Sequence, residues 1–279
     1  MSRPRYRGRF APTPSGPLHL GSLVMAVASW LDARHHQGEW WLRIDDIDPP
    51  REQPGAADRI QRQLEAFALH WDGPVHFQHA RHDAYEQAVQ QLLHDGHAFY
   101  CRLSRSELAR HRHIHPGPAL AVHDPCDAAV RLAVDHTPLC FDDRFQGRCC
   151  YHLDRQEGAF VIRRRDGLYA YQLACALDDA ALGITDVVRG LDLLDSTARQ
   201  IHVQQCLGLP APRYGHLPVV LDEAGEKLSK SAGAAAIDHG QAGITLHQAL
   251  KHLGLTVDPD RPDLMLRQAL AQYLPPEPA

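Results

Sequence analysis

The sequence of 279 residues has no hydrophobic stretch long enough to cross a membrane. Its longest apolar run, from Leu23 to Leu31, is far shorter than the roughly 20 apolar residues that a membrane helix needs. No signal-peptide pattern opens the chain, and its seven cysteines lack a disulfide-like spacing. These absences predict a cytoplasmic protein with reduced thiols and no membrane partner.

The sequence also lacks an excess of basic residues, since 29 lysines and arginines stand against 34 acidic residues and the net charge is −5. This balance excludes a generic polyanion binder, so any contact with nucleic acid must come from local patches. Candidate patches are Arg3, Arg5 and Arg7 near the start and the run from Arg163 to Arg165. Each of the two patches is as typical of an ordinary solvated surface as it is of an RNA contact.

Residues 9–22 read RFAPTPSGPLHLGS and combine a strand end, a proline-rich loop and a helix start. The prolines cannot continue a helix or a ladder, whereas the segment from about Leu20 to His36 lacks proline and favours a helix. His19 and Ser22 are therefore expected at a helix N-terminus, where unpaired N–H groups and a positive partial charge suit phosphates. Gly21 would let an adenine ring approach the backbone closely. This segment predicts an ATP-binding site.

A second motif, KLSKS, places Lys227 and Lys230 in a loop between Gly225 and Gly233. A mobile lysine loop can close on a triphosphate and stabilise charge that grows in a transition state. Taken alone, either motif is more typical of an ordinary surface segment. Their joint occurrence, in this order, makes coincidence a poor explanation.

The two motifs resemble the HIGH and KMSKS signatures of class I aminoacyl-tRNA synthetases. Between them, residues 42–52 read LRIDDIDPPRE after an apolar segment, which indicates a buried strand that ends in a cluster of acids. This segment resembles the glutamate-specific branch of the class, with Asp45 where that branch has glutamate. The resemblance implies an enzyme in which the carboxylate of L-glutamate attacks the α-phosphate of ATP.

The resemblance also implies a role for individual residues. Glutamate needs a carboxylate for its ammonium and an arginine fork for its side chain. By resemblance, glutamate is bound by Arg9, Thr13, Asp45, Tyr171 and Arg189. ATP, which arrives with Mg²⁺, is bound by His19, Gly21, Ser22 and Lys230, and the catalytic residues are His19, Lys227 and Lys230.

Further segments, including residues 54–57, 70–73, 81–85, 164–168 and 188–190, resemble shortened paralogues of glutamyl-tRNA synthetase. Those paralogues transfer glutamate to the queuosine base in the anticodon of tRNA(Asp). Two alternatives stay open. One is a truncated synthetase that charges the 3′ end of tRNA(Glu), and the other is a non-catalytic tRNA-binding paralogue.

The order of expected elements predicts an α/β fold with a doubly wound parallel sheet of the Rossmann type. Residues 1–101 would form the first half of this catalytic domain and residues 159–232 the second half, which carries the lysine loop. Residues 102–158 break the rhythm and read as an inserted subdomain with its own small β part. Residues 233–279 would be a helical appendage, with no anticodon-binding domain.

The insertion departs from the related enzymes, which often hold zinc with Cys-x-Cys and a later Tyr-x-x-x-Cys. Here Cys101 is followed by Leu103, and Val122 precedes Cys126, so two of four ligands are absent. His123, with His111, His113 and His115 nearby, could substitute. We expect no structural zinc, with Cys101, Cys126 and His123 as weak candidate ligands.

Overall fold

The centre of the fold is a parallel sheet. The computed structural model describes residues 5–220, 237 and 239–276. Thr185 N–H donates to the carbonyl of Arg7 at 2.9 Å, which joins the two halves of the sheet in the spatial order β3-β2-β1-β9-β10. The strands are β1 (Arg7–Phe10), β2 (Glu39–Ile44), β3 (His76–Phe77), β9 (Asp186–Gly190) and β10 (Arg213–Leu217). The pairs β1–β2, β2–β3 and β9–β10 are parallel.

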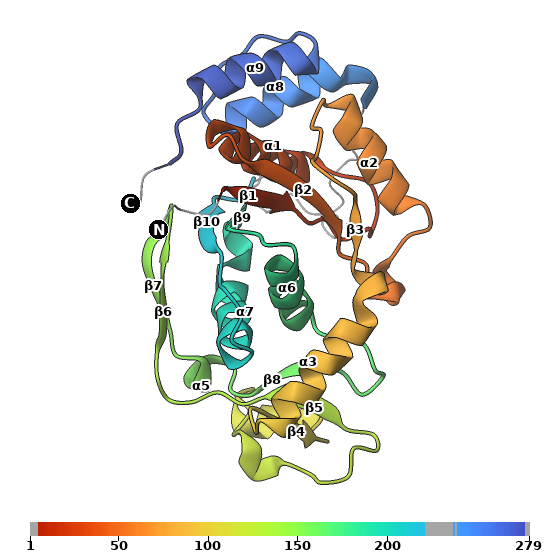
Figure 1. The fold of residues 1–279 in the computed structure, drawn as a ribbon, viewed down its shortest axis with the longest axis vertical. Coiled ribbons are helices and arrows are strands. Elements are labelled where there is room, and N and C mark those ends of the chain that lie inside the picture. Colours follow the sequence, from red (N-terminus) through yellow and green to blue (C-terminus); the bar gives the residue numbers. More distant parts are fainter. Residues whose placement is uncertain (1–4, 221–236, 238, 277–279) are drawn as a thin grey trace.

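Helices cover both faces of this sheet, as Figure 1 shows. One face carries α1 (Leu20–His35), α2 (Ala56–Ala66), α8 (Ala242–His252) and α9 (Pro262–Gln272), and the other carries α6 (Tyr171–Ala181) and α7 (Leu194–Cys206). The doubly wound α/β fold predicted from the sequence is therefore confirmed. The strand order reverses between β1 and β9, and such a switch point opens a crevice at the carboxyl ends of the strands.

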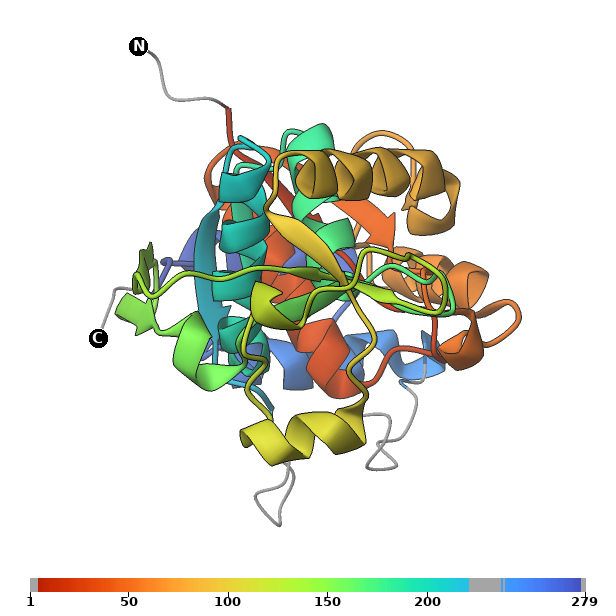
Figure 2. The same cartoon turned by 90° about the horizontal axis from the view of Figure 1, so that it is seen from below.

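A separate antiparallel sheet lies below the parallel one, and Figure 2 looks onto it from below. It contains β4 (Ala98–Cys101), β5 (Ala129–Leu132) and β8 (Phe160–Arg163), in the order β4-β5-β8. The sequence analysis placed both β4 and β8 within the two halves of the doubly wound domain, whereas the structure pairs them with β5 in this separate antiparallel sheet. A short buried apolar run has no feature that distinguishes a parallel from an antiparallel neighbour.

The remaining helices are α3 (His82–His94), α4 (Arg105–Leu108) and α5 (Leu153–Gln156), and short 3₁₀ helices lie at Pro49–Arg51, Gln78–Arg81, Ala109–His111, Pro118–Leu120, Leu191–Leu193 and His239–Gln241.

A hairpin of β6 (Leu139–Asp143) and β7 (Gly147–Tyr151) runs along the edge of β10, at the left of Figure 1. Arg144 N–H, in its turn, donates to the carbonyl of Tyr214 at 2.8 Å. The ring of Phe145 packs against Gly215, where a Cβ would meet the ring at 2.6 Å, so only glycine allows this approach. The hairpin is thus docked directly on the parallel sheet.

Within the hairpin, Cys140 and Cys150 form a disulfide. The expectation of reduced thiols throughout is therefore wrong at these two positions. The two cysteines are ten residues apart in sequence, and they face each other because the antiparallel register of β6 and β7 pairs them directly.

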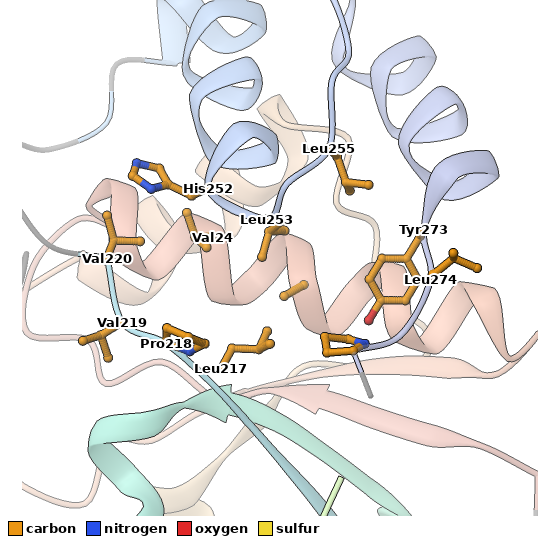
Figure 3. A pocket seen from close by; sticks show the side chains of 12 residues that line it. Val24, Leu217, Pro218, Val219, Val220, His252, Leu253, Leu255, Tyr273 and Leu274 are labelled. Atoms are coloured by element: carbon orange, nitrogen blue, oxygen red, sulfur yellow. The ribbon is translucent and has the colours of Figure 1, made fainter. Parts of the chain in front are cut away.

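The largest hydrophobic core continues from the sheet into the C-terminal helices. Leu23 and Leu31 of α1 and Trp40 of β2 belong to the same buried cluster as Leu246 of α8 and Met265 of α9. An apolar pocket lies at the border of these helices, where Val24 of α1, Leu217 and Leu253 converge (Figure 3). Nowhere in the described part of the chain is a helix long and apolar enough to cross a membrane.

Candidate active site

The loop after β1 leads into the N-terminus of α1 at the switch point of the sheet. His19 is the N-cap residue, and its Nδ1 accepts a hydrogen bond of 3.3 Å from the backbone N–H of Ser22. Its Nε2 lies 2.8 Å from the hydroxyl of Ser22. The first turn, which includes Gly21, has no acidic residue. The placement of His19 and Ser22 at a helix N-terminus is confirmed, and this end of α1 has the charge character that binds phosphates.

A buried cluster of arginines and aspartates lies beside this helix end, between β1, β2 and α6. Arg9 donates two hydrogen bonds of 3.1 Å to the two carboxylate oxygens of Asp179. Arg43 donates to Asp45 at 2.6 Å and to Asp179 at 2.6 Å. Cys175 completes the cluster, with its sulfur 3.3 Å from Arg43 Nη2. Each charge in the cluster therefore has an opposite charge beside it, as burial demands.

The two aspartates of this cluster differ in their protonation behaviour. Burial raises the pKa of Asp179, but Arg9 and Arg43 more than reverse this and hold that pKa at about 2. The pKa of Asp45 is raised by burial, although Arg43 and Arg9 act against the rise. A further positive group next to Asp45 would favour its charged form.

Arg189, in β9, is the other buried arginine of the site. Its Nε donates to Nε2 of His216 at 3.0 Å, and its Nη2 donates to the hydroxyl of Thr197 at 2.7 Å and to the carbonyl of Leu193 at 3.4 Å. Among the residues that the structure describes, its Nη1 has no hydrogen-bond partner. Only 4% of Arg189 is exposed, so Nη1 is a buried donor available to a ligand.

Tyr171, the first residue of α6, lies close enough to Arg9, Asp45 and Arg189 to interact with them electrostatically. Burial raises the pKa of its hydroxyl. Thr13 is half-buried in the loop between β1 and α1. The structure therefore brings Arg9, Asp45, Tyr171 and Arg189, all predicted from the sequence, into one site. Lys227 and Lys230 lie outside the described residues.

The sequence analysis missed several residues of this site. Arg43 stands two positions before Asp45 on a strand, so the two side chains share a face, and this spacing was an available signal. Asp178 and Asp179 are adjacent in a helix that is mostly apolar after Gln172, which also indicates buried acids with partners. His216 and Thr197 had no comparable signal.

The residues considered for zinc are not gathered into one cluster of three or more possible ligands. Cys101 is buried and lies 3.2 Å from Nε2 of His115, whereas Cys126 and His123 are exposed. Nδ1 of His115 accepts a hydrogen bond of 3.0 Å from the N–H of Gly117, so the ring proton lies on Nε2. The contact between Cys101 and His115 is therefore a hydrogen bond from Nε2 to the sulfur. Among the described residues, no group of three or more histidines, cysteines and acids could hold a metal ion. The expectation of no structural zinc stays a prediction.

A doubly wound sheet with a helix N-terminus and buried arginines at its switch point defines a nucleotide-binding α/β enzyme domain. A family model described as "tRNA synthetases class I (E and Q), catalytic domain" matches residues 5–125 and 121–269. The chain belongs to this family of class I aminoacyl-tRNA synthetases.

Named relatives cover nearly all of the chain. A glutamyl-Q tRNA(Asp) synthetase of Pseudomonas putida strain F1 is 50% identical over 99% of this chain and 93% of its own length. A protein of the same name from Ectopseudomonas mendocina is 53% identical over 89% of this chain and 85% of its own length.

Among solved structures, a glutamate tRNA ligase from Elizabethkingia meningosepticum, in complex with its amino acid, is similar at a TM-score of 0.72 and 27% identity. The match covers 82% of this chain and 53% of that one. The chain therefore spans about half the length of that ligase.

Proposed function

We propose that this protein activates L-glutamate with ATP and transfers the glutamyl group to the queuosine base of tRNA(Asp). The observation that carries the proposal is the 50% identity, over 99% of the chain, to a protein named glutamyl-Q tRNA(Asp) synthetase. The arrangement of charges at the switch point supports it. The proposal also assigns the protein to the cytoplasm, where tRNA and ATP occur together.

The buried charges suit glutamate. Arg9, Arg43 and Arg189 contribute three positive charges, and Asp45 and Asp179 contribute two negative ones. Glutamate carries two carboxylates and one ammonium, so its net charge of about −1 offsets the excess positive charge. In our proposal, Nη1 of Arg189 and the hydroxyl of Tyr171 bind the side-chain carboxylate. Asp45, held in place by Arg43, binds the ammonium.

The remaining pocket residues orient the reacting carboxylate. Thr13, half-buried in the loop after β1, would offer its hydroxyl to the substrate, and Arg9, paired with Asp179, would add positive charge to the site. Because Arg9 donates two hydrogen bonds to Asp179, we expect it to contribute positive electrostatic potential to the glutamate site more than a two-pronged hydrogen bond to the substrate.

ATP would bind with its phosphates at the N-terminus of α1. Backbone N–H groups and His19 would stabilise the triphosphate there, with Ser22 fixing the ring of His19 and Gly21 leaving space for the adenine. Mg²⁺ would arrive with ATP and offset phosphate charge, and Lys227 and Lys230 are proposed to do the same. The glutamate carboxylate oxygen bonds to the α-phosphorus while the bond to pyrophosphate breaks.

In the transfer step, a hydroxyl of the queuosine cyclopentene diol attacks the activated carbonyl of glutamate. The new ester bond forms as the bond to AMP breaks, and the hydroxyl proton leaves to solvent. Anticodon bases are single-stranded, so such a base can be splayed into a pocket. No nucleophile from the protein is required.

The test compares tRNA(Asp) with and without the queuosine modification, using labelled glutamate and ATP. We expect label only on the modified tRNA, and glutamate-dependent ATP–pyrophosphate exchange without any tRNA. Equal labelling of both preparations, or labelling that disappears when the 3′ end is oxidised by periodate with queuosine protected, would contradict the proposal. Those results would instead favour charging of a 3′-terminal ribose.

A further inference from the structure

We propose that Asp143, in the inserted hairpin, and His216, in β10, are positioning residues that aim the guanidinium of Arg189 into the glutamate pocket. This inference rests on the proposed function and deepens it. It makes the hairpin of β6 and β7 part of amino-acid recognition through its contact with His216.

The contacts form a continuous chain from the hairpin to the pocket. One carboxylate oxygen of Asp143 accepts backbone N–H groups of Phe145, Gln146 and His216 at 3.0, 3.0 and 3.1 Å. The other oxygen lies 2.5 Å from Nδ1 of His216. Nε2 of His216 then lies 3.0 Å from Nε of Arg189. Asp143, His216 and Arg189 are all at most 4% exposed, so solvent does not compete for these bonds.

The proton positions follow from the donors. Arginine only donates, so Nε2 of His216 must accept from Arg189, and the ring proton must lie on Nδ1, facing Asp143. Burial lowers the pKa of His216, and Arg189 acts in the same direction, although the hydrogen bond with Asp143 opposes them. The neutral ring is the form that this chain of contacts requires.

These hydrogen bonds leave one nitrogen of Arg189 without a partner among the described residues. Nε is fixed by His216, and Nη2 is fixed by Thr197 and the carbonyl of Leu193. Nη1 is the remaining corner of a planar group, and it has no partner among the described residues. Two fixed corners of a rigid plane determine the third, so Asp143 and His216 set the direction in which Arg189 meets a carboxylate.

The decisive variant is Asp143→Asn. Its amide oxygen can still accept the three backbone N–H groups, but its NH₂ group would face Nδ1 of His216. The ring would then carry its proton on Nε2, which opposes the N–H of Arg189, so the geometry is kept while the tautomer is wrong. Asp142→Asn is the matched control, because Asp142 is the preceding residue, is exposed and pairs only with Arg148 among the described residues.

The measurements are glutamate-dependent ATP–pyrophosphate exchange and the ring nitrogen chemical shifts of His216 by NMR. We expect Asp143→Asn to raise the KM for glutamate about 10- to 100-fold, as for loss of a hydrogen bond to a charged group. The KM for ATP should change less than about twofold, and Asp142→Asn should match the natural protein. The nitrogen shifts should move the proton from Nδ1 to Nε2.

An unchanged glutamate KM, or an equal rise in the KM values for glutamate and ATP, would overturn the inference. If Asp143→Asn does not fold, Thr197→Val and Thr197→Ser replace it. Only valine removes the hydroxyl that accepts from Nη2 of Arg189 and lies 3.0 Å from Nε2 of His216. The carbonyl of Leu193 remains an acceptor for Nη2 in both variants. A rise in glutamate KM with valine but not with serine supports the positioning of Arg189, and equal behaviour contradicts it. If the natural protein does not catalyse glutamate-dependent exchange, only the proposed function is refuted. The tautomer of His216 observed by NMR would still support or overturn the contacts from Asp143 through His216 to Arg189.

Discussion

Arg9 and Asp179, which are 170 residues apart in the sequence, form a two-pronged ion pair in the interior of the protein. Arg43 donates to the same carboxylate, so β1, β2 and α6 meet at one buried charge. An ion pair of this kind adds little net stability compared with apolar residues, but loss of one partner leaves an uncompensated charge. Its position beside the switch point suggests that it serves the pocket.

Replacement of Arg189 by lysine tests the carboxylate-binding role directly. Arg189→Lys should raise the KM for glutamate by about 100-fold, because an ammonium carries all its donors on one nitrogen and cannot span the distance between His216 and the ligand as a guanidinium does. Exchange kinetics at varied glutamate concentration measure this effect. Arg213→Lys, on the neighbouring strand and half exposed, should leave the KM unchanged. Equal effects of the two substitutions would contradict the assignment.

Replacement of Asp179 by asparagine should lower the free energy of unfolding by about 3–5 kcal/mol, since Arg9 and Arg43 would lose their shared partner. Because the pKa of Asp179 is held at about 2, below its unfolded value of about 3.9, its contribution is present above pH 4. That contribution is lost as the pH falls from about 4 to about 2. Denaturant unfolding at several pH values should show this loss in the natural protein and not in Asp179→Asn. An exposed control, Asp258→Asn, should keep the natural pH dependence.

His115 should make the protein less stable in mild acid. Burial, with additional repulsion from Arg131 and His111, lowers its pKa to about 4. The unfolded chain binds this proton near pH 6.5, so stability is present above that pH and is lost as the pH falls toward 4. Thermal unfolding between pH 7 and pH 4 should be less pH-dependent in His115→Gln than in the natural protein. The exposed His123→Gln variant should behave like the natural protein, and a reversed order would refute the assignment.

The disulfide predicts the number of free thiols. The denatured, unreduced protein should react with a thiol reagent at Cys101, Cys126, Cys149, Cys175 and Cys206, and not at Cys140 or Cys150. Mass spectrometry of the alkylated protein gives the count. Alkylation of Cys140 and Cys150 without a reductant would contradict the disulfide.

The lysine motif leads to a prediction from the sequence alone, since Lys230 lies outside the described residues. Lys230→Ala should slow glutamate activation by roughly 10²–10³, the scale for losing one preorganised group that stabilises transition-state charge. Pyrophosphate exchange measures the rate. Lys251→Ala, in the last turn of α8, is the matched control and should retain the natural rate.

Local signals made much of the fold predictable from the sequence. The proline-rich loop and the proline-free segment after it locate the start of α1, and therefore His19, within a residue. The helices expected within residues 233–279 are present as α8 and α9. These features depend on neighbours in the chain, which a sequence displays.

The missed features depend on contacts between distant segments. The partners of Arg43 include Asp179, which is 136 residues away, and the pairing of β4 with β5 depends on where the insertion folds back. Arg163, a candidate RNA contact by sequence, donates to both oxygens of Glu86 at 2.8 Å. Arg164 and Arg165 lie exposed beside it. A basic run has no periodicity that separates its structural members from its solvated ones.

The side chain of Asp32 in α1 is fully buried, and its hydrogen bonds affect how the protein unfolds. It accepts hydrogen bonds from Tyr6 before β1, from Arg144 in the inserted hairpin and from Tyr273 after α9. A solvent-inaccessible carboxylate that loses one of these donors is left undercompensated, so the others cannot detach independently at low cost. The segment around Tyr6, the hairpin of β6 and β7 and the C-terminal helices should therefore melt in a single cooperative transition, with matching hydrogen-exchange protection at all three places.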